Sequence, residues 1–338
     1  TTSGACIVTL GYDEPHVHSI TLPDGGRITD LALSPNHEQI VLAQTLPEEA
    51  LWLADKEGNI VRELIASTDE LFWMPAWSYD GRQIAYLRAT DSYTPPGGDL
   101  PAYRHTVLDV MSIADATPHA LTPATGKVLE FAWSPNGKQI LISARLEDYN
   151  QDGNIDQRDP ARLYLITLAD QSLQPVADYT LPGLAVEKPD WSPDGNYISY
   201  IVRMTELVIM AMPQGQEIAR FEIGANRTYQ WSVTGSKLAY VGNSEPSLDK
   251  SYSDVFIFDV AAHTTVQLTD TAAYTHASNF HKYGIRLNDI AWSPDEKHIA
   301  FMWNWMGNDY LVIASADGSQ LTRVAGPFSS YHLFAWGK

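Results

Sequence analysis

The chain has 338 residues, of which 44% are hydrophobic and 11% aromatic, which is ample for a large buried core. Its 41 acidic and 22 basic side chains give a formal charge of −19, which disfavours nucleic acid and anionic lipid as partners and favours cations or basic proteins. No segment approaches the roughly 18 consecutive apolar residues of a membrane helix, so we expect no transmembrane segment.

The chain begins at Thr1 without Met and without an apolar targeting segment, as in a protein whose signal peptide has been removed, so we expect export. The single cysteine, Cys6, excludes an internal disulfide. Two interpretations of Cys6 stay open. It resembles the acylated residue of a bacterial lipoprotein, or it is a strand residue packed beside Ile7 and Val8.

One phrase returns six times along the chain. It combines an aromatic residue, usually Trp, with Ser, Pro, an acid or amide, and Gly. The copies lie at residues 31–36, 76–81, 132–137, 190–195, 230–235 and 291–296. Pro presets φ near −65° and Gly accepts a positive φ, so each copy predicts a tight turn between two strands.

Apolar segments with β character follow every copy. Second strands are expected at 40–43, 84–87, 140–143, 197–201, 238–241 and 299–303, and third strands at 50–54, 106–111, 163–168, 207–212, 255–260 and 310–314. A more polar fourth strand is clearest at 120–122, 266–269 and 320–322, as suits a sheet edge. Copies roughly 40 to 60 residues apart are typical of four-stranded blades with loops of variable length.

This pattern resembles the TolB-like, WD-repeat-like β-propeller family, whose repeats run Ala-Trp-Ser-Pro-Asp-Gly-Lys, then Ile-Ala-Phe, then an outer strand ending in Leu-Thr. The resemblance covers nearly the whole chain and implies an all-β propeller. Departures are Leu33 for Trp, Val233 and Thr234 for Pro-Asp, and Glu296 for Gly.

The two ends of the chain supply parts of a further blade. Residues 334–336 repeat the start of the motif, and residues 6–12 and 17–22 are strand-like without a hairpin phrase. Pairing of the terminal strands would close the ring and remove exposed sheet edges. We therefore predict one propeller domain over residues 1–338 with seven four-stranded blades, with six blades as the alternative.

The tryptophans at the repeat position are expected to pack between blades: Trp77, Trp133, Trp191, Trp231, Trp292 and Trp336. Trp303 and Trp305 stand outside the pattern on one strand face, where a role in ligand binding is an alternative to packing.

An insertion in the third blade matches an EF-hand calcium loop over residues 148–159. Asp148, Asn150 and Asp152 stand at loop positions one, three and five, Gly153 takes the sharp turn at six, and Ile155 fills the apolar position eight. The remaining predicted ligands are Asn154 through its carbonyl, Asp156 through water, and Asp159.

Asp159 replaces the commoner Glu at position twelve, which resembles dockerin-type loops. Pro160 follows at once, so we expect a strand near Ala161 instead of an exiting helix. A single loop with no second to pair with favours a structural Ca²⁺ over a sensor. Millimolar extracellular calcium would fill even a weak site, which again favours export.

Catalytic motifs are scarce. The chain has no His-Glu-x-x-His, no Gly-x-Ser-x-Gly, no Cys-x-x-Cys and no phosphate-binding Gly-rich loop, so we expect a binding protein rather than an enzyme. His276 and His281 in an insertion are the remaining candidates for a metal or substrate.

Insertions at 91–104 and 243–253 arise at the same blade position as the calcium loop, so we expect one loop-rich binding face.

Two functions compete. The first is a secreted or periplasmic calcium-binding propeller that acts as a scaffold and binds a protein or glycan on its loop-rich face; the TolB resemblance implies periplasmic protein contacts. The alternative is a carbohydrate-active enzyme, a polysaccharide lyase or hydrolase, with its site at the channel mouth. Propellers with similar repeats also include gating domains of serine peptidases.

Overall fold

The computed structural model describes residues 5–10, 15–45, 48–89, 92–93, 102–103, 105–176, 186–223, 227–243, 253–270, 286–305 and 308–328. The described residues form strands and turns, with no helix among them. The chain divides into two compact units, residues 1–190 and 191–338, which are described separately. Among these residues no helix is long and apolar enough to cross a membrane.

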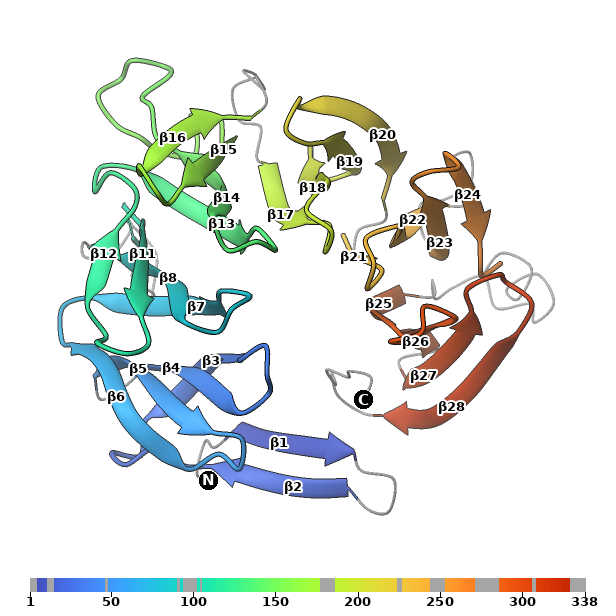
Figure 1. Cartoon of the computed structure of the whole chain (residues 1–338), viewed down its shortest axis with the longest axis horizontal. Coiled ribbons are helices and arrows are strands. Elements are labelled where there is room, and N and C mark those ends of the chain that lie inside the picture. The colour runs from blue at the N-terminus through green and yellow to red at the C-terminus, as the bar shows by residue number, and fades with distance from the viewer. Residues whose placement is uncertain are drawn as a thin grey trace. The chain divides into compact units, whose positions relative to one another are not determined.

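Unit 1 holds three four-stranded antiparallel sheets (Figure 1). Their strands are β3 (Arg27–Leu33), β4 (Gln39–Thr45), β5 (Glu49–Asp55) and β6 (Ile60–Ser67); β7 (Leu71–Trp77), β8 (Gln83–Ala89), β11 (Val107–Ser112) and β12 (Pro118–Ala120); and β13 (Lys127–Trp133), β14 (Gln139–Arg145), β15 (Arg162–Thr167) and β16 (Ser172–Pro175). Two hairpins accompany them, β1 (Ala5–Leu10) with β2 (Pro15–Ile20) and β9 (Ser92–Tyr93) with β10 (Ala102–Tyr103).

Unit 2 continues the pattern with three more sheets, the first of which starts at the end of unit 1. Their strands are β17 (Val186–Trp191), β18 (Tyr197–Val202), β19 (Glu206–Ala211) and β20 (Gln216–Glu222); β21 (Tyr229–Trp231), β22 (Lys237–Asn243), β23 (Ser253–Asp259) and β24 (Thr264–Gln267); and β25 (Arg286–Trp292), β26 (His298–Trp305), β27 (Asn308–Ser315) and β28 (Leu321–Phe328). Every sheet is a meander in chain order, so the predicted strand order is confirmed.

The repeated phrase forms the predicted turn between the first and second strands. In the third copy, Ser134 Oγ donates to Asn136 Oδ1 at 2.9 Å and accepts the backbone N–H of Gln139 at 2.9 Å, while Gly137 adopts a φ of 66°. The same three-part arrangement recurs at Ser78 and at Ser192. The motif serine is buried in all six copies, and in each its Oγ accepts a backbone N–H inside the turn.

Burial follows the position of a strand within its sheet. The second strands β4, β14 and β22 are buried at five consecutive residues, as expected for strands covered on both faces. The fourth strands β12 and β24 are exposed throughout, as predicted for polar edges. They begin two residues before the predicted 120–122 and 266–269, and the Leu-Thr residues that follow them include Thr122, Leu268 and Thr269, which are buried.

Trp77, Trp133, Trp231 and Trp292 pack between successive sheets, as predicted, whereas Trp336 lies outside the described residues. Trp77 and Trp133 are buried in unit 1, and their indole Nε1 atoms donate to the carbonyls of Ala32 at 3.0 Å and Ala76 at 3.2 Å in the preceding sheet. Trp303, considered as a ligand-facing residue, is buried as well and belongs to the core cluster around Trp292.

The blade number is confirmed only in part. The described residues form six four-stranded sheets, and β1 and β2 pair with each other as a separate two-stranded sheet. Residues 334–336, which carry the seventh copy, lie outside the described residues. Closure by the terminal strands and the seventh blade therefore stay predictions.

Candidate functional site

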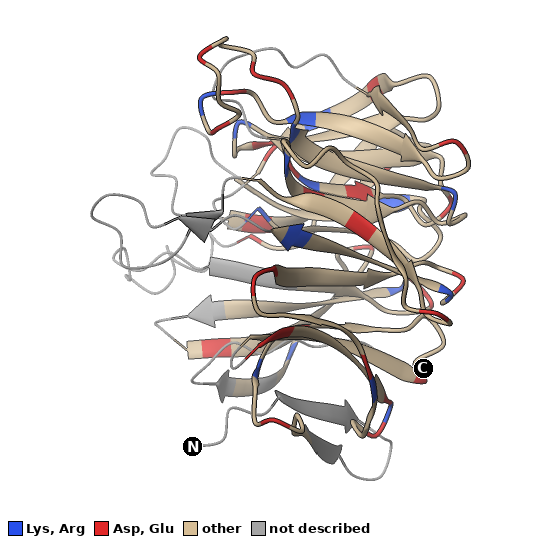
Figure 2. Cartoon of the chain, turned by 90° about the vertical axis from the view of Figure 1, so that its left-hand side faces the viewer, with Lys and Arg blue, Asp and Glu red and all other residues tan. Residues whose placement is uncertain are grey.

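The predicted calcium loop connects β14 to β15 in unit 1, and Figure 2 shows acidic and basic segments next to one another where this loop projects beyond the strands. Asp148 organises its first half. Its Oδ1 accepts the backbone N–H of Asp152 at 3.1 Å and its Oδ2 that of Gly153 at 2.7 Å. Gly153 has a φ of 87°, which fits the sharp turn expected at position six.

Two further side chains bend the backbone around the same region. Asn150 Oδ1 accepts the N–H of Asp152 at 2.9 Å, and Asp152 Oδ1 accepts that of Asn154 at 3.0 Å. The structure thus places Asp148, Asn150 and Asp152 in a single compact loop.

Asp159 closes the loop from its far end. Its side chain is fully buried, and its carboxylate accepts backbone N–H groups from Tyr149 at 2.9 Å, Asn150 at 3.2 Å and Asp156 at 2.9 Å. Arg145 Nε donates to the Asp159 carbonyl at 3.0 Å. Asp159 therefore ties the start and the end of the loop together, and β15 begins three residues later, without an intervening helix.

Arg158 is a member of this site that sequence reasoning missed. Its Nη2 lies 2.7 Å from Asp152 Oδ2 and 2.6 Å from Asp156 Oδ2, so one guanidinium joins two predicted ligands. Hydrogen bonding to Arg158 lowers the pKa of Asp156 below its ordinary value. Within the part of the chain that the structure describes, no group of three or more His, Cys, Asp or Glu side chains is arranged to hold a metal.

A cavity of about 740 Å³ lies beside the loop. Asp148, Asn154 and Arg158 of the loop line it, as do Lys127 at the start of β13 in the same sheet and His105 just before β11 of the preceding sheet. The loop is thus part of a hollow large enough for a small ligand.

The structure describes little of the other residues that were predicted as candidate binding sites. His276 and His281 lie outside the described residues, as does most of the insertions at 91–104 and 243–253. The position of the loop-rich face therefore stays a prediction, except for the calcium loop itself.

Comparison with known proteins gave no matching family model. The chain is 22% identical over 326 residues to dipeptidyl-peptidase 5 of Porphyromonas gingivalis, an alignment that covers 82% of this chain and 44% of that protein. It thus spans less than half the length of this relative.

Two solved structures are similar. A prolyl endopeptidase structure, from a study of the role of inter-domain dynamics in catalysis and specificity, matches with a TM-score of 0.63 at 13% identity, over 90% of this chain and 43% of that one. TolB from Acinetobacter baumannii matches with a TM-score of 0.45 at 18% identity, over 88% of this chain and 63% of that one.

The described residues form six four-stranded meanders, each with the repeated turn between its first two strands, and this arrangement together with the similarity to the prolyl endopeptidase chain defines the class of fold. The protein is a β-propeller.

Proposed function

We propose that this chain is the substrate-binding propeller of a peptidase-like protein and that the catalytic residues lie outside these 338 residues. The observation that carries the proposal is the extent of the alignment with dipeptidyl-peptidase 5, which covers most of this chain but only 44% of that relative. An alignment of this shape is expected when a chain corresponds to one part of a larger enzyme.

The residues of the chain support a binding role rather than a catalytic one. The sequence has no Gly-x-Ser-x-Gly elbow and no His-Glu-x-x-His motif. The similarity to a prolyl endopeptidase chain, again over less than half of its length, favours peptides over polysaccharides as ligands. These comparisons support the hydrolase alternative more than a general scaffold or a polysaccharide lyase.

The proposal is tested with the 338-residue chain and two kinds of substrate. We expect no hydrolysis of dipeptidyl chromogenic substrates, together with saturable binding of short peptides in a calorimetric titration. Hydrolysis by the chain alone would make it an enzyme in its own right. Binding of oligosaccharides without binding of peptides would contradict the peptidase-like role.

We further propose that residues 148–159 bind one Ca²⁺ that orders the long connection between β14 and β15. The donors that would hold it are hard oxygens, which calcium prefers: the carboxylates of Asp148, Asp152 and Asp159, the Asn150 amide, the Asn154 carbonyl and, through water, Asp156. Support comes from the turns that already curve the loop around Asp148 and from the buried anchor at Asp159.

Calcium also fits the proposed location outside the cytoplasm, where millimolar calcium would fill a weak site. Calorimetric titration of chelator-stripped protein is the test, and we expect one ion per chain. A protein that shows neither heat of binding nor a melting shift at millimolar calcium would have no such site.

A further inference from the structure

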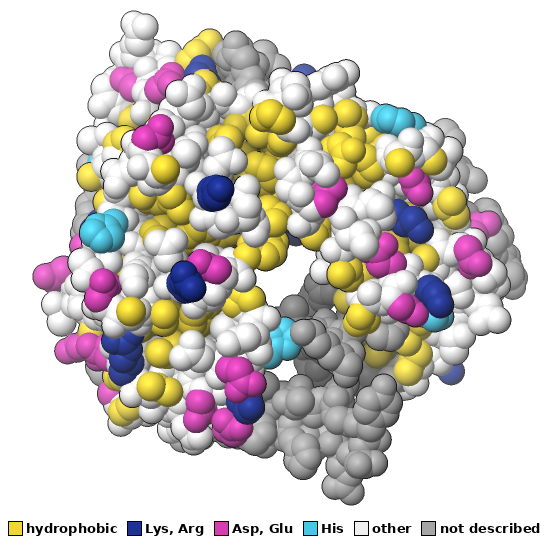
Figure 3. Space-filling view, in the orientation of Figure 1, with side chains coloured by type: hydrophobic (Ala, Val, Ile, Leu, Met, Phe, Trp, Pro, Cys, Tyr) yellow, Lys and Arg dark blue, Asp and Glu magenta, His cyan; other side chains and the backbone are white. Residues whose placement is uncertain are grey.

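A second cavity lies entirely within unit 2, between the sheet β21–β22–β23–β24 and the sheet β25–β26–β27–β28. It has a volume of about 550 Å³ and is formed by the strand ends and turns at one end of the two sheets. We call it the unit 2 groove. Figure 3 shows basic and acidic side chains interspersed with hydrophobic ones over these strands.

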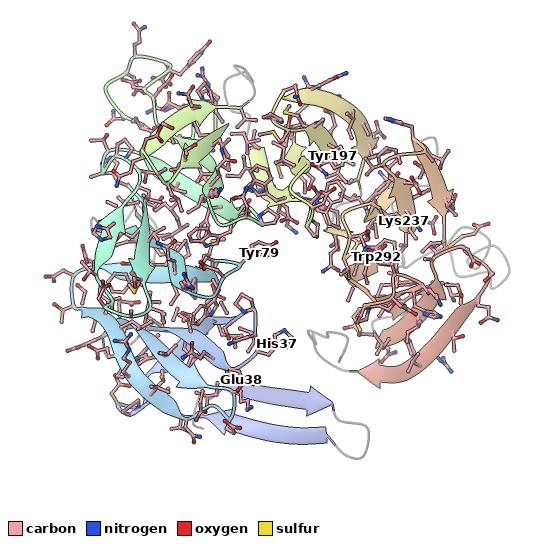
Figure 4. All side chains as sticks on the ribbon, in the orientation of Figure 1. His37, Glu38, Tyr79, Tyr197, Lys237 and Trp292 are labelled. Carbon is pink, nitrogen blue, oxygen red and sulfur yellow. The ribbon has the colours of Figure 1, made fainter. Side chains whose placement is uncertain are left out.

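Two departures from the repeat line this groove. Five residues after the motif serine, the first three copies carry Gln39, Gln83 and Gln139, and the fourth carries Tyr197, which does not line the groove. The fifth and sixth copies carry Lys237 (Figure 4) and His298 at that position, and both line the groove. Positions that depart from an otherwise consistent repeat are where functional constraints are expected.

Glu296 is a further departure. It stands where four copies have Gly and the first has His37, and like His37 it adopts a positive φ, here 56°, which is unfavourable for a residue with a side chain. Its Oε1 accepts the backbone N–H of Thr234, itself a departure in the fifth copy. The two irregular turns therefore contact each other at the edge of the groove.

The acidic side chains of the groove already have backbone partners. Besides Glu296, Asp259 accepts the N–H of Ala262 at 2.9 Å and Asp317 accepts that of Ser319 at 2.9 Å. Each of these carboxylates therefore already accepts a hydrogen bond from the backbone of a turn.

The ammonium groups of the two lysines that line the groove differ from these carboxylates. Across the residues that the structure describes, neither Lys237 nor Lys297 forms an ion pair. Ile257, Val266 and Ala316 supply apolar lining in the same groove. Two ammonium groups that form no ion pair, together with an apolar surface, match a carboxylate carried on a small apolar group.

We propose that the unit 2 groove binds the carboxylate of a peptide through Lys237 and Lys297. This inference rests on the proposed peptide-binding function and adds a place and a charge preference to it. The carboxylate is either an acidic side chain or the C-terminus of the peptide, since both present the same two oxygens to the lysines.

The experiment compares three acetylated pentapeptides by calorimetric titration of the full chain. The first is Ala-Ala-Glu-Ala-Ala with an amidated C-terminus, the second replaces Glu by Gln, and the third is Ala-Ala-Ala-Ala-Ala with a free C-terminal carboxylate. We expect the Gln peptide to bind most weakly. Whichever charged peptide binds more tightly identifies the source of the carboxylate.

Substitutions locate the binding. Lys237→Gln and Lys297→Gln are each expected to weaken binding of the charged peptide by about fivefold, the upper range for a solvent-accessible ion pair, and to leave the Gln peptide unaffected. Lys138→Gln is the matched control, because Lys138 follows Asn136 in the third copy as Lys297 follows Asp295 in the sixth, and it does not line the groove.

The outcomes separate the two proposals. If peptides bind but neither charged peptide binds more tightly than the Gln peptide, or if the groove variants bind like the Lys138→Gln control, the groove assignment is wrong and the peptide-binding function stands. If none of the three peptides binds the unmodified chain, both proposals are wrong.

Discussion

The indole Nε1 of Trp292 donates a hydrogen bond to the backbone carbonyl of Gln230 at 3.1 Å. Gln230 immediately precedes the motif tryptophan of the preceding sheet, and Trp133 reaches the corresponding residue, Ala76, in unit 1. One residue type at one repeat position thus supplies both the apolar bulk between two sheets and a polar link that sets their spacing.

This link predicts a graded response at Trp292. Trp292→Phe keeps most of the buried ring and removes the donor, so we expect a loss of about 1 to 2 kcal/mol in the free energy of unfolding. Trp292→Ala also leaves a cavity and should cost about 3 to 5 kcal/mol. Urea denaturation of both variants checks this, with Val233→Ala at an exposed turn position as the control. Equal losses of stability in the two variants would show that the hydrogen bond, and not the packing of the ring, provides the stabilisation.

The motif turns should make the fold sensitive to acid. Hydrogen bonds from Ser78 and Ser293 lower the pKa of Asp80 and Asp295 below the ordinary value. A carboxyl with a lowered pKa adds stability that is present above its unfolded pKa of about 4 and is lost as the pH falls through its folded pKa.

We therefore expect Asp80→Asn combined with Asp295→Asn to reduce the loss of stability between about pH 5 and about pH 2. Asn36 and Asn136 already accept the same serine hydrogen bonds in the first and third copies, so the amide fits the turn. The test is the urea midpoint across this pH range. An unchanged pH dependence would mean that other groups control acid unfolding.

Much of the fold could be predicted from the sequence because the repeat is local. The turn needs little more than Ser and a residue at positive φ: Thr234 replaces the acid or amide in the fifth copy, and Glu296 forms the turn in place of Gly. The convergence of Lys237, His298 and Glu296 on one groove could not be predicted. It depends on how two successive sheets pack, and the signal was limited to their departure from the repeat.

The calcium loop, like the fold, could be predicted from the sequence only in part. The positions of Asp148, Asn150 and Asp152 follow from a motif of fixed spacing, and the start of β15 soon after Pro160 was predicted from the proline. The pairing of Arg158 with two predicted ligands has no sequence motif, because it depends on the curvature of the folded loop.

Two acidic residues of the loop should respond differently to substitution. Asp159→Asn removes a buried carboxylate that accepts three backbone N–H groups, so we expect lower thermal stability even in excess chelator. Asp152→Asn leaves the loop anchored and should abolish only the calcium-induced rise in melting temperature. Melting curves with calcium and with chelator separate the effects. Equal behaviour of the two variants in chelator would contradict the anchoring role of Asp159.

Arg158 should compete with calcium for Asp152 and Asp156, because one guanidinium contacts both carboxylates. Arg158→Gln is therefore expected to raise calcium affinity a few-fold. Arg203→Gln, in the solvent-exposed turn between β18 and β19, is the matched control that removes the same charge far from the loop in sequence. Calorimetric titration measures both affinities. A weaker site in Arg158→Gln would show that Arg158 supports the loop rather than competes for it.

The central claim is that this propeller binds peptides as part of a peptidase-like protein. Its most direct test is affinity selection by the immobilised 338-residue chain from a mixture of defined peptides and oligosaccharides, with mass spectrometry of what is retained. We predict that intact peptides are retained, those with a carboxylate preferentially, and that none is cleaved. Retention of oligosaccharides alone, or of neither class, would contradict the account.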